Sequence, residues 1–88
     1  MEGALKIRVY YLPEIDTLDI WVDDPSLEVE STAISDNVIL RYSGGKRVIG
    51  VEVLSLKKLC REELELVPPK IREVIVGVLS RFKSIDIV

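Results

Sequence analysis

A chain of 88 residues with 48% apolar residues and a net charge of −3 can form one domain with a modest hydrophobic core. Its longest uncharged apolar run, residues 74–80, is far too short for a membrane span. A secretory signal begins with basic residues, whereas this chain has an acid, Glu2, at that place. We therefore expect a cytoplasmic protein. The chain has no histidine, so it lacks the commonest general base and the commonest metal ligand. Its single cysteine, Cys60, cannot form an internal disulfide. We therefore expect no catalytic site, metal or cofactor.

The first part of the chain predicts three strands separated by turns. Residues 5–11 and 17–23 alternate polar and apolar side chains, the pattern of a strand with one wet face. Pro13 and Asp16 favour a turn between these two strands. Residues 27–34 predict a weaker, half-exposed strand at an edge of the sheet.

The middle of the chain predicts a hairpin. Residues 38–42 and 47–54 form the two strands, and Gly44 and Gly45 of the turn between them can supply the positive φ that tight hairpin turns need. Gly50, on the second strand, permits the close approach of a neighbouring aromatic side chain or backbone.

Glu52 lies on the same strand as Gly50. An acid in a central strand needs a basic partner or solvent. Arg41 on the neighbouring strand is one candidate partner, and Lys6 and Arg8 are others if their strand lies close. We expect a cross-strand ion pair at Glu52.

Two helices follow the strands. Ser55 is a candidate N-cap for a short helix over residues 56–65, and Pro68-Pro69 ends it and begins a second helix that extends to about Lys83. Val76 lies off the apolar stripe of this second helix, whose spacing is strongly amphipathic. The stripe consists of Ile71, Val74, Ile75, Val78, Leu79 and Phe82. Residues 84–88 predict a short final strand or an ordered tail.

Together these elements predict the α+β class. We expect an antiparallel β-meander of about five strands, with the short helix and the longer C-terminal helix packed on one face. The whole chain, 1–88, should form a single domain.

Two motifs mark the ends of the strand region. Tyr11 to Leu18 reads Tyr-x-Pro-Glu-x-Asp-x-Leu, and Gly50 to Leu54 reads Gly-x-Glu-x-Leu. In this order and spacing, residues 6–59 resemble the family catalogued as domain of unknown function 2283. The resemblance implies a small prokaryotic protein with a β-meander, a following helix and no established activity, and antitoxin-like binding to toxin-like proteins for some members. The helix over residues 68–83 lies outside the resemblance.

The charges are unevenly distributed. Residues 1–40 carry a balance of −7 and residues 41–88 a balance of +4. This polarity could steer a partner, or it could form two solvated faces. The sequence pI of about 4.9 is far from the basic range of nucleic-acid-binding domains, so we expect neither nucleic acid nor a membrane as a partner. Abundant Lys, Arg and Glu, with no Gln and a single Asn, suggest a thermophilic source.

Four residues are candidates for interaction or for structural polar contacts: Trp21, Tyr10, Glu52 and Val76. Trp21 is either covered by a second layer, for which the main helix is one candidate, or exposed as a binding anchor, and the covered arrangement is the one we expect. Glu14 and Asp16 could hold a divalent cation weakly, but a turn residue and a solvated acid explain them as well.

The function we expect is that of a self-associating protein-interaction module without catalysis. A sheet with two edges and a helix with an extra apolar residue favour a homodimer formed through an edge or through the helix. The alternative is an antitoxin-like partner of a small basic protein. An enzyme would require a pocket lined by Glu52, Asp19 and Tyr10.

Overall fold

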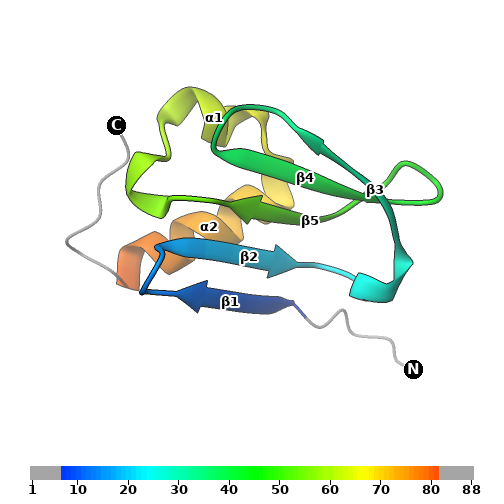
Figure 1. Cartoon of the computed structure of the whole chain (residues 1–88), viewed down its shortest axis with the longest axis horizontal. Coiled ribbons are helices and arrows are strands. Elements are labelled where there is room, and N and C mark those ends of the chain that lie inside the picture. The colour runs from blue at the N-terminus through cyan, green and yellow to red at the C-terminus, as the bar shows by residue number, and fades with distance from the viewer. Residues whose placement is uncertain (1–6, 82–88) are drawn as a thin grey trace.

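The computed structural model of the protein describes residues 7–81 (Figure 1). Five strands form a single sheet: β1 (Arg8–Leu12), β2 (Thr17–Trp21), β3 (Glu28–Ala33), β4 (Val38–Ser43) and β5 (Val48–Val53). Two 3-10 turns and two helices complete the domain: η1 (Pro25–Leu27), η2 (Leu56–Lys58), α1 (Arg61–Leu66) and α2 (Pro69–Arg81). The α+β class, with five antiparallel strands, a short helix and a longer C-terminal helix, is confirmed. The strand or tail expected over residues 84–88 lies outside the described residues, as does Phe82.

The strands run in the order β1-β2-β5-β4-β3, and every neighbouring pair is antiparallel. Strands β3, β4 and β5 form a meander, whereas β1 and β2 form a separate hairpin beside β5. The sheet is therefore not one continuous series of hairpins, because β2 does not pair with β3. The cause lies in η1, where the carboxylate of Asp24 accepts a hydrogen bond from the N–H of Ser26 at 2.9 Å. This turn carries the chain past the end of β2 to the far edge of the sheet (Figure 1).

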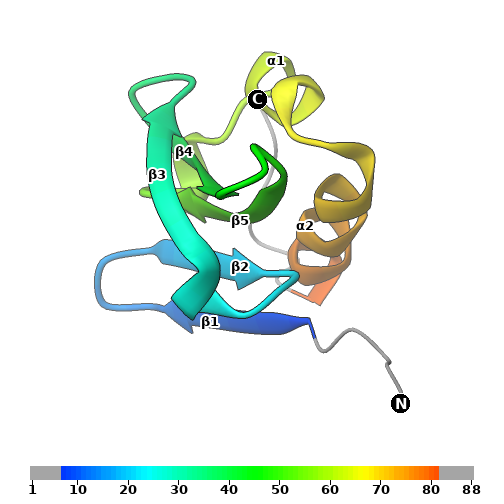
Figure 2. The ribbon, with the colours of Figure 1, turned by 90° about the vertical axis from the view of Figure 1, so that its right-hand side faces the viewer.

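Both helices pack on the same face of the sheet, which places the core between the sheet and the helices (Figure 2). The predicted stripe of α2 faces this core, with Val74 and Val78 half-buried beside it. Complete burial of one large aliphatic side chain in this core stabilises the fold by about 1.5–3 kcal/mol. The core includes Leu18, Ile20, Val51, Val53, Leu56, Leu59, Ile71 and Ile75, all of them no more than 1% exposed. None of the helices within residues 7–81 is long and apolar enough to cross a membrane.

The helix predicted over residues 56–65 is divided. It consists of η2 and α1, separated at Cys60, whose backbone is extended with φ −108° and ψ 166°. The N–H of Cys60 donates to the Glu63 carboxylate at 3.1 Å, so α1 begins here and not at Ser55. Ser55 makes no side-chain cap on η2, and its hydroxyl donates a hydrogen bond to Asp16 at 3.2 Å.

The β4–β5 turn forms as predicted, but for a different conformational reason. Neither Gly44 nor Gly45 has a positive φ; Lys46 takes the left-handed conformation, with φ 61°. The N–H of Lys46 donates to the carbonyl of Ser43 at 3.0 Å, and the N–H of Ser43 donates to the carbonyl of Arg47 at 2.9 Å. The turn is thus closed by backbone hydrogen bonds around a non-glycine residue.

Candidate functional site

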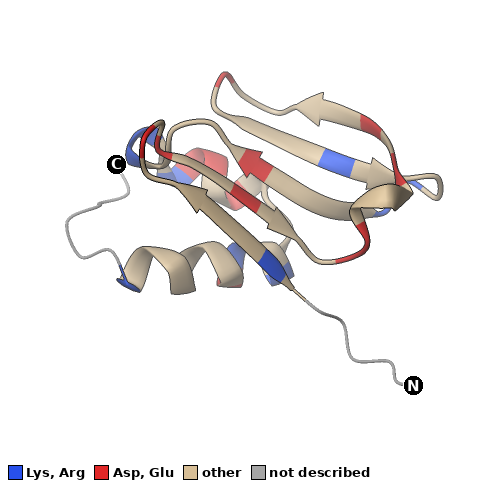
Figure 3. Ribbon diagram, turned by 60° about the horizontal axis from the view of Figure 1, so that its bottom comes forward, with Lys and Arg blue, Asp and Glu red and all other residues tan. Residues whose placement is uncertain are grey.

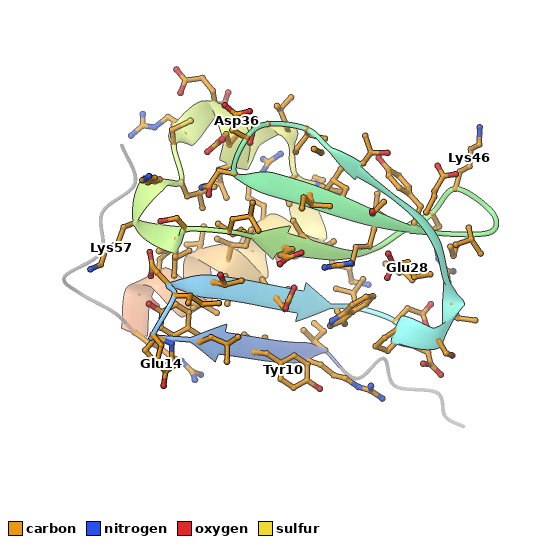
Figure 4. The ribbon with its side chains drawn as sticks, in the orientation of Figure 1. Tyr10, Glu14, Glu28, Asp36, Lys46 and Lys57 are labelled. Carbon is orange, nitrogen blue, oxygen red and sulfur yellow. The ribbon has the colours of Figure 1, made fainter. Side chains whose placement is uncertain are left out.

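The face of the sheet opposite the helices is the first candidate site, and it is the face turned toward the viewer in Figures 1 and 4. Strand pairing places Tyr10, Asp19 and Glu52 in one row across β1, β2 and β5. A second row places Trp21 opposite Gly50. Alternate residues of a strand point to opposite sides, and the residues between these are in the core, so both rows face away from the helices. We call this surface the open face.

Arg41 of β4 is the centre of the open face. Its Nη2 lies 2.5 Å from Glu52 Oε1 and 3.7 Å from Asp19 Oδ1, and its Nη1 lies 3.3 Å from Glu28 Oε2. The guanidinium also lies over the ring of Trp21, 5.2 Å from the ring centroid. These contacts join four strands through one side chain that is only 20% exposed. The cross-strand partner that the sequence predicts for Glu52 is therefore Arg41, and not Lys6 or Arg8.

Asp19 is the least compensated member of this cluster. Burial raises the pKa of its carboxyl, although the charge of Arg41 acts in the opposite direction. Its Oδ1 is buried and has no hydrogen-bond partner within residues 7–81, and the same is true of Nε of Arg41. Asp19 Oδ1 and Arg41 Nη2 attract each other at 3.7 Å without forming a hydrogen bond. The cluster thus contains three carboxylates and a single guanidinium.

Trp21 is positioned by a close contact with Gly50. A Cβ placed on Gly50 would lie 3.0 Å from Cε3 of Trp21 and 3.0 Å from the carbonyl oxygen of Ile20. The close approach that the sequence predicts at Gly50 is therefore confirmed. The main helix is not what covers Trp21, because α2 packs against the apolar face where Ile20 lies. Trp21 is half-buried under Arg41 instead.

The structure brings three of the four sequence-predicted residues together. Tyr10, Trp21 and Glu52 all lie on the open face, and the Tyr10 side chain is 52% exposed (Figure 4). Val76 is 48% exposed on α2, on the other side of the sheet, so it shares no surface with them. Sequence reasoning missed Glu28, whose approach to Arg41 depends on the irregular register between β3 and β4, where Glu28 pairs with Ser43.

Asp16 joins the β1–β2 turn to the segment that follows β5. Its Oδ1 accepts a hydrogen bond from the Tyr11 hydroxyl at 2.5 Å, and its Oδ2 accepts from the N–H of Lys57 at 2.8 Å and from Ser55. The turn conformation that the sequence predicts is present, since Asp16 has φ 58°. Partial burial acts to raise the pKa of Asp16, but the hydrogen bonds from Tyr11, Lys57 and Ser55 outweigh it, so its pKa is lower than usual.

These hydrogen bonds account for Tyr11 and Asp16 of the first motif. They also weaken the hypothesis of a divalent cation at Glu14 and Asp16. Both carboxylate oxygens of Asp16 accept hydrogen bonds from the protein, which leaves fewer lone pairs for an ion that Glu14 would share. No group of three or more potential metal ligands occurs within residues 7–81. The arrangement at Asp16 is a structural link between two chain segments.

Strand β1 forms the second candidate site. It is an edge strand, with apolar side chains exposed on both sides: Ile7 (42%), Val9 (41%), Tyr10 (52%) and Leu12 (49%). Beside it, Val9 of β1 and residues of α2 line a groove of about 220 Å³. The residues of α2 in this groove are Val74, Gly77, Val78 and Arg81. We call β1 and this groove together the β1 surface.

The acids of the open face and the groove beside β1 do not form a common site. The Asp19 and Glu52 carboxylates contact Arg41, and the groove beside β1 is lined by other residues. Cys60 is half-buried at the start of α1. An open sheet face and an exposed edge strand are features of proteins that bind other proteins.

The family described as "Protein of unknown function (DUF2283)" matches residues 8–57, which is more than half of the chain. The chain belongs to this family, as the resemblance of its motifs predicts. The matched region contains the whole sheet and ends at Lys57, so the Asp16 link joins the two ends of the family core, and α1 and α2 lie beyond it. No curated protein and no solved structure matches the chain.

Proposed function

We propose that this domain is a protein-interaction module that self-associates through the β1 surface. The observation that carries the proposal is the exposure of apolar side chains along a sheet edge. An unprotected edge strand presents unpaired backbone N–H and C=O groups, and it pairs readily with another strand. Four exposed apolar side chains on and next to β1 add a hydrophobic contribution to such pairing.

The geometry favours a symmetric pair. Two β1 strands related by a twofold axis perpendicular to the sheet would pair antiparallel and extend it from five strands to ten. The same axis keeps both helix layers on one side. The groove beside Val9 in one copy would then face the corresponding groove in the other, and the half-buried Val74 and Val78 would come to line a continuous apolar layer.

The opposite edge of the sheet lacks these properties. Strand β3 has a register shift between Glu28 and Glu30, and such bulges and edge charges discourage edge-to-edge pairing. Its exposed apolar residue, Val29, is 66% exposed but lies within the irregular segment. Self-association through β1 therefore leaves β3 as the free edge of the assembly.

The test is the mass in solution. Light scattering over a range of protein concentrations should give a dimer for the wild-type chain and a monomer for Val9→Lys, which places a charge in the groove. Val29→Lys, an exposed valine on the other edge, is the matched control and should remain dimeric. A monomeric wild-type chain at the highest concentration would refute the proposal.

A second candidate is an antitoxin-like role, in which the domain binds a small basic protein. The charge balance of −7 over residues 1–40 favours it, as does the excess of acids over bases on the open face. Co-purification with the product of a neighbouring gene would support this candidate. Failure to co-purify at low and at high salt, with both proteins folded, would contradict it.

A further inference from the structure

We infer that the open face is a docking surface for an arginine-bearing segment of another protein, with the arginine bound between Tyr10 and Asp19. This inference deepens the second candidate above and does not require self-association. Tyr10 belongs to both surfaces, because it lies on β1 and on the open face, whereas Asp19 lies on the open face alone. Three properties of the open face support it: its charge, the state of Asp19 and the position of Tyr10.

The open face carries more acidic than basic side chains. Asp19, Glu28 and Glu52 share a single cation, Arg41. Arg8 of β1 is the cross-strand partner of Trp21, so it adds a second cation to this face, and the three carboxylates still outnumber the two cations. In Figure 3, acidic positions lie on several strands of the sheet. A positively charged partner segment is therefore complementary to this surface.

Asp19 has capacity for a further cation. Its carboxyl lies 3.7 Å from Arg41 Nη2, and Arg41 is also shared with Glu52 and Glu28. The side chain of Asp19 remains 29% exposed, so a partner can approach it from solvent. A second guanidinium at this carboxylate would supply the compensation that Arg41 divides among three acids.

Tyr10 supplies an aromatic surface beside this carboxylate. It is the cross-strand partner of Asp19, and directly opposite side chains on one face of an antiparallel pair have Cβ atoms about 4.5–5.5 Å apart. Tyr10 is 52% exposed as a residue. The planar guanidinium of an arginine can therefore stack its face on the Tyr10 ring while its edge donates hydrogen bonds to the Asp19 carboxylate. The compact ammonium group of lysine is less suited to these two contacts.

The open face already contains one example of this arrangement. Arg41 lies over Trp21 and contacts a carboxylate of the neighbouring strand, Glu52. Tyr10 and Asp19 repeat the combination of an aromatic ring and a carboxylate nearer the edge of the sheet. The occupant expected there is the corresponding guanidinium of a partner.

Trp21 gives a direct experimental signal, because it is the only tryptophan of the chain and lies on the same face. Hexa-arginine and hexa-lysine peptides would be titrated into the full chain, and binding would be followed by Trp21 fluorescence. We expect hexa-arginine to bind more tightly than hexa-lysine. Asp19→Asn and Tyr10→Ala should each weaken hexa-arginine binding by about tenfold, as expected when one well-placed charged or aromatic contact is lost.

Glu65→Gln is the matched control, since Glu65 is an exposed acid on α1, away from the open face. It should change the affinity by less than about twofold, because exposed charges contribute little to specific contacts. Equal affinity for the two peptides, or equal losses in Asp19→Asn and Glu65→Gln, would show general charge attraction and overturn the inference. Absence of binding would overturn it as well. A monomeric wild-type chain that still prefers hexa-arginine would refute self-association alone.

Discussion

The two edges of the sheet are built in opposite ways. Strand β3 has a bulge between two glutamates, and Arg41 holds its first residue, Glu28, against the rest of the sheet. Strand β1 is regular, apolar on both sides and bordered by a groove. Asp16 holds the turn that follows β1, where it accepts hydrogen bonds from Tyr11 and Lys57. The comparison teaches that one edge is protected against pairing and the other is left available for it.

Arg41→Met should produce the largest loss of stability, because it removes the side chain that holds the β3 side. Three carboxylates would remain close together without a cation, which we expect to lower the free energy of unfolding by about 3 kcal/mol. Arg47→Met is the control: Arg47 pairs with Asp23, but its side chain is 66% exposed, so its loss should be below about 1 kcal/mol. Urea denaturation measures both, and equal losses would contradict the central role of Arg41.

Asp16→Ala tests the β1 side in the same way. It removes hydrogen bonds to a charged acceptor and places alanine at a positive φ, so we expect a loss of about 2 kcal/mol. Asp16→Asn should lose less, because asparagine tolerates this backbone conformation. If the two variants lose the same stability in urea denaturation, the backbone does not contribute at this turn.

Gly50→Ala probes the centre of the sheet, where β5 lies between the two edges. The added methyl group would lie 3.0 Å from backbone and ring atoms, and we expect a loss of about 1–2 kcal/mol with a change in Trp21 fluorescence. Gly77→Ala is the comparison, since a Cβ there meets nothing within 4 Å. Alanine in the middle of α2 should raise the melting temperature, because glycine is the poorer helix former. Equal effects would mean that the contact with Trp21 imposes no constraint.

The smallest effect concerns pH, and it has opposite signs for two aspartates. The pKa of Asp19 is raised, so its ionisation destabilises the fold and stability falls as pH rises through its titration. The pKa of Asp16 is lowered, so its contribution is present at neutral pH and is lost as pH falls through its folded pKa. Asp19→Asn should therefore be slightly more stable than wild type at pH 7 and no more stable at low pH. A loss of stability at pH 7 would contradict this assignment.

Local features of the fold were predictable from the sequence. The stripe of α2, the turn at Asp16 and the close approach at Gly50 depend on periodicity and on single residue types. The pairing of Glu52 with Arg41 was also accessible, because the β4–β5 turn makes these two strands neighbours. The motif residues Tyr11 and Asp16 were visible in the sequence, although their shared hydrogen bond was not.

Non-local features were not predictable in this way. A period of two shows which side of a strand is wet, but it does not show which strand lies beside it. The β2–β5 pairing, and hence the approach of Asp19 to Arg41, depends on where η1 directs the chain. The covering of Trp21 by Arg41 and not by α2 depends on which face of the sheet α2 packs against. The groove at Val9 forms between segments about 70 residues apart, although apolar residues on both sides of β1 were a signal that could have indicated an open edge.

The most direct test of the account is the solution mass of three proteins measured side by side by light scattering: wild type, Val9→Lys and Val29→Lys. The account predicts a dimer for the wild type and for Val29→Lys, and a monomer for Val9→Lys with unchanged secondary structure. A wild-type monomer, or a dimer that Val29→Lys disrupts and Val9→Lys does not, would contradict association through β1.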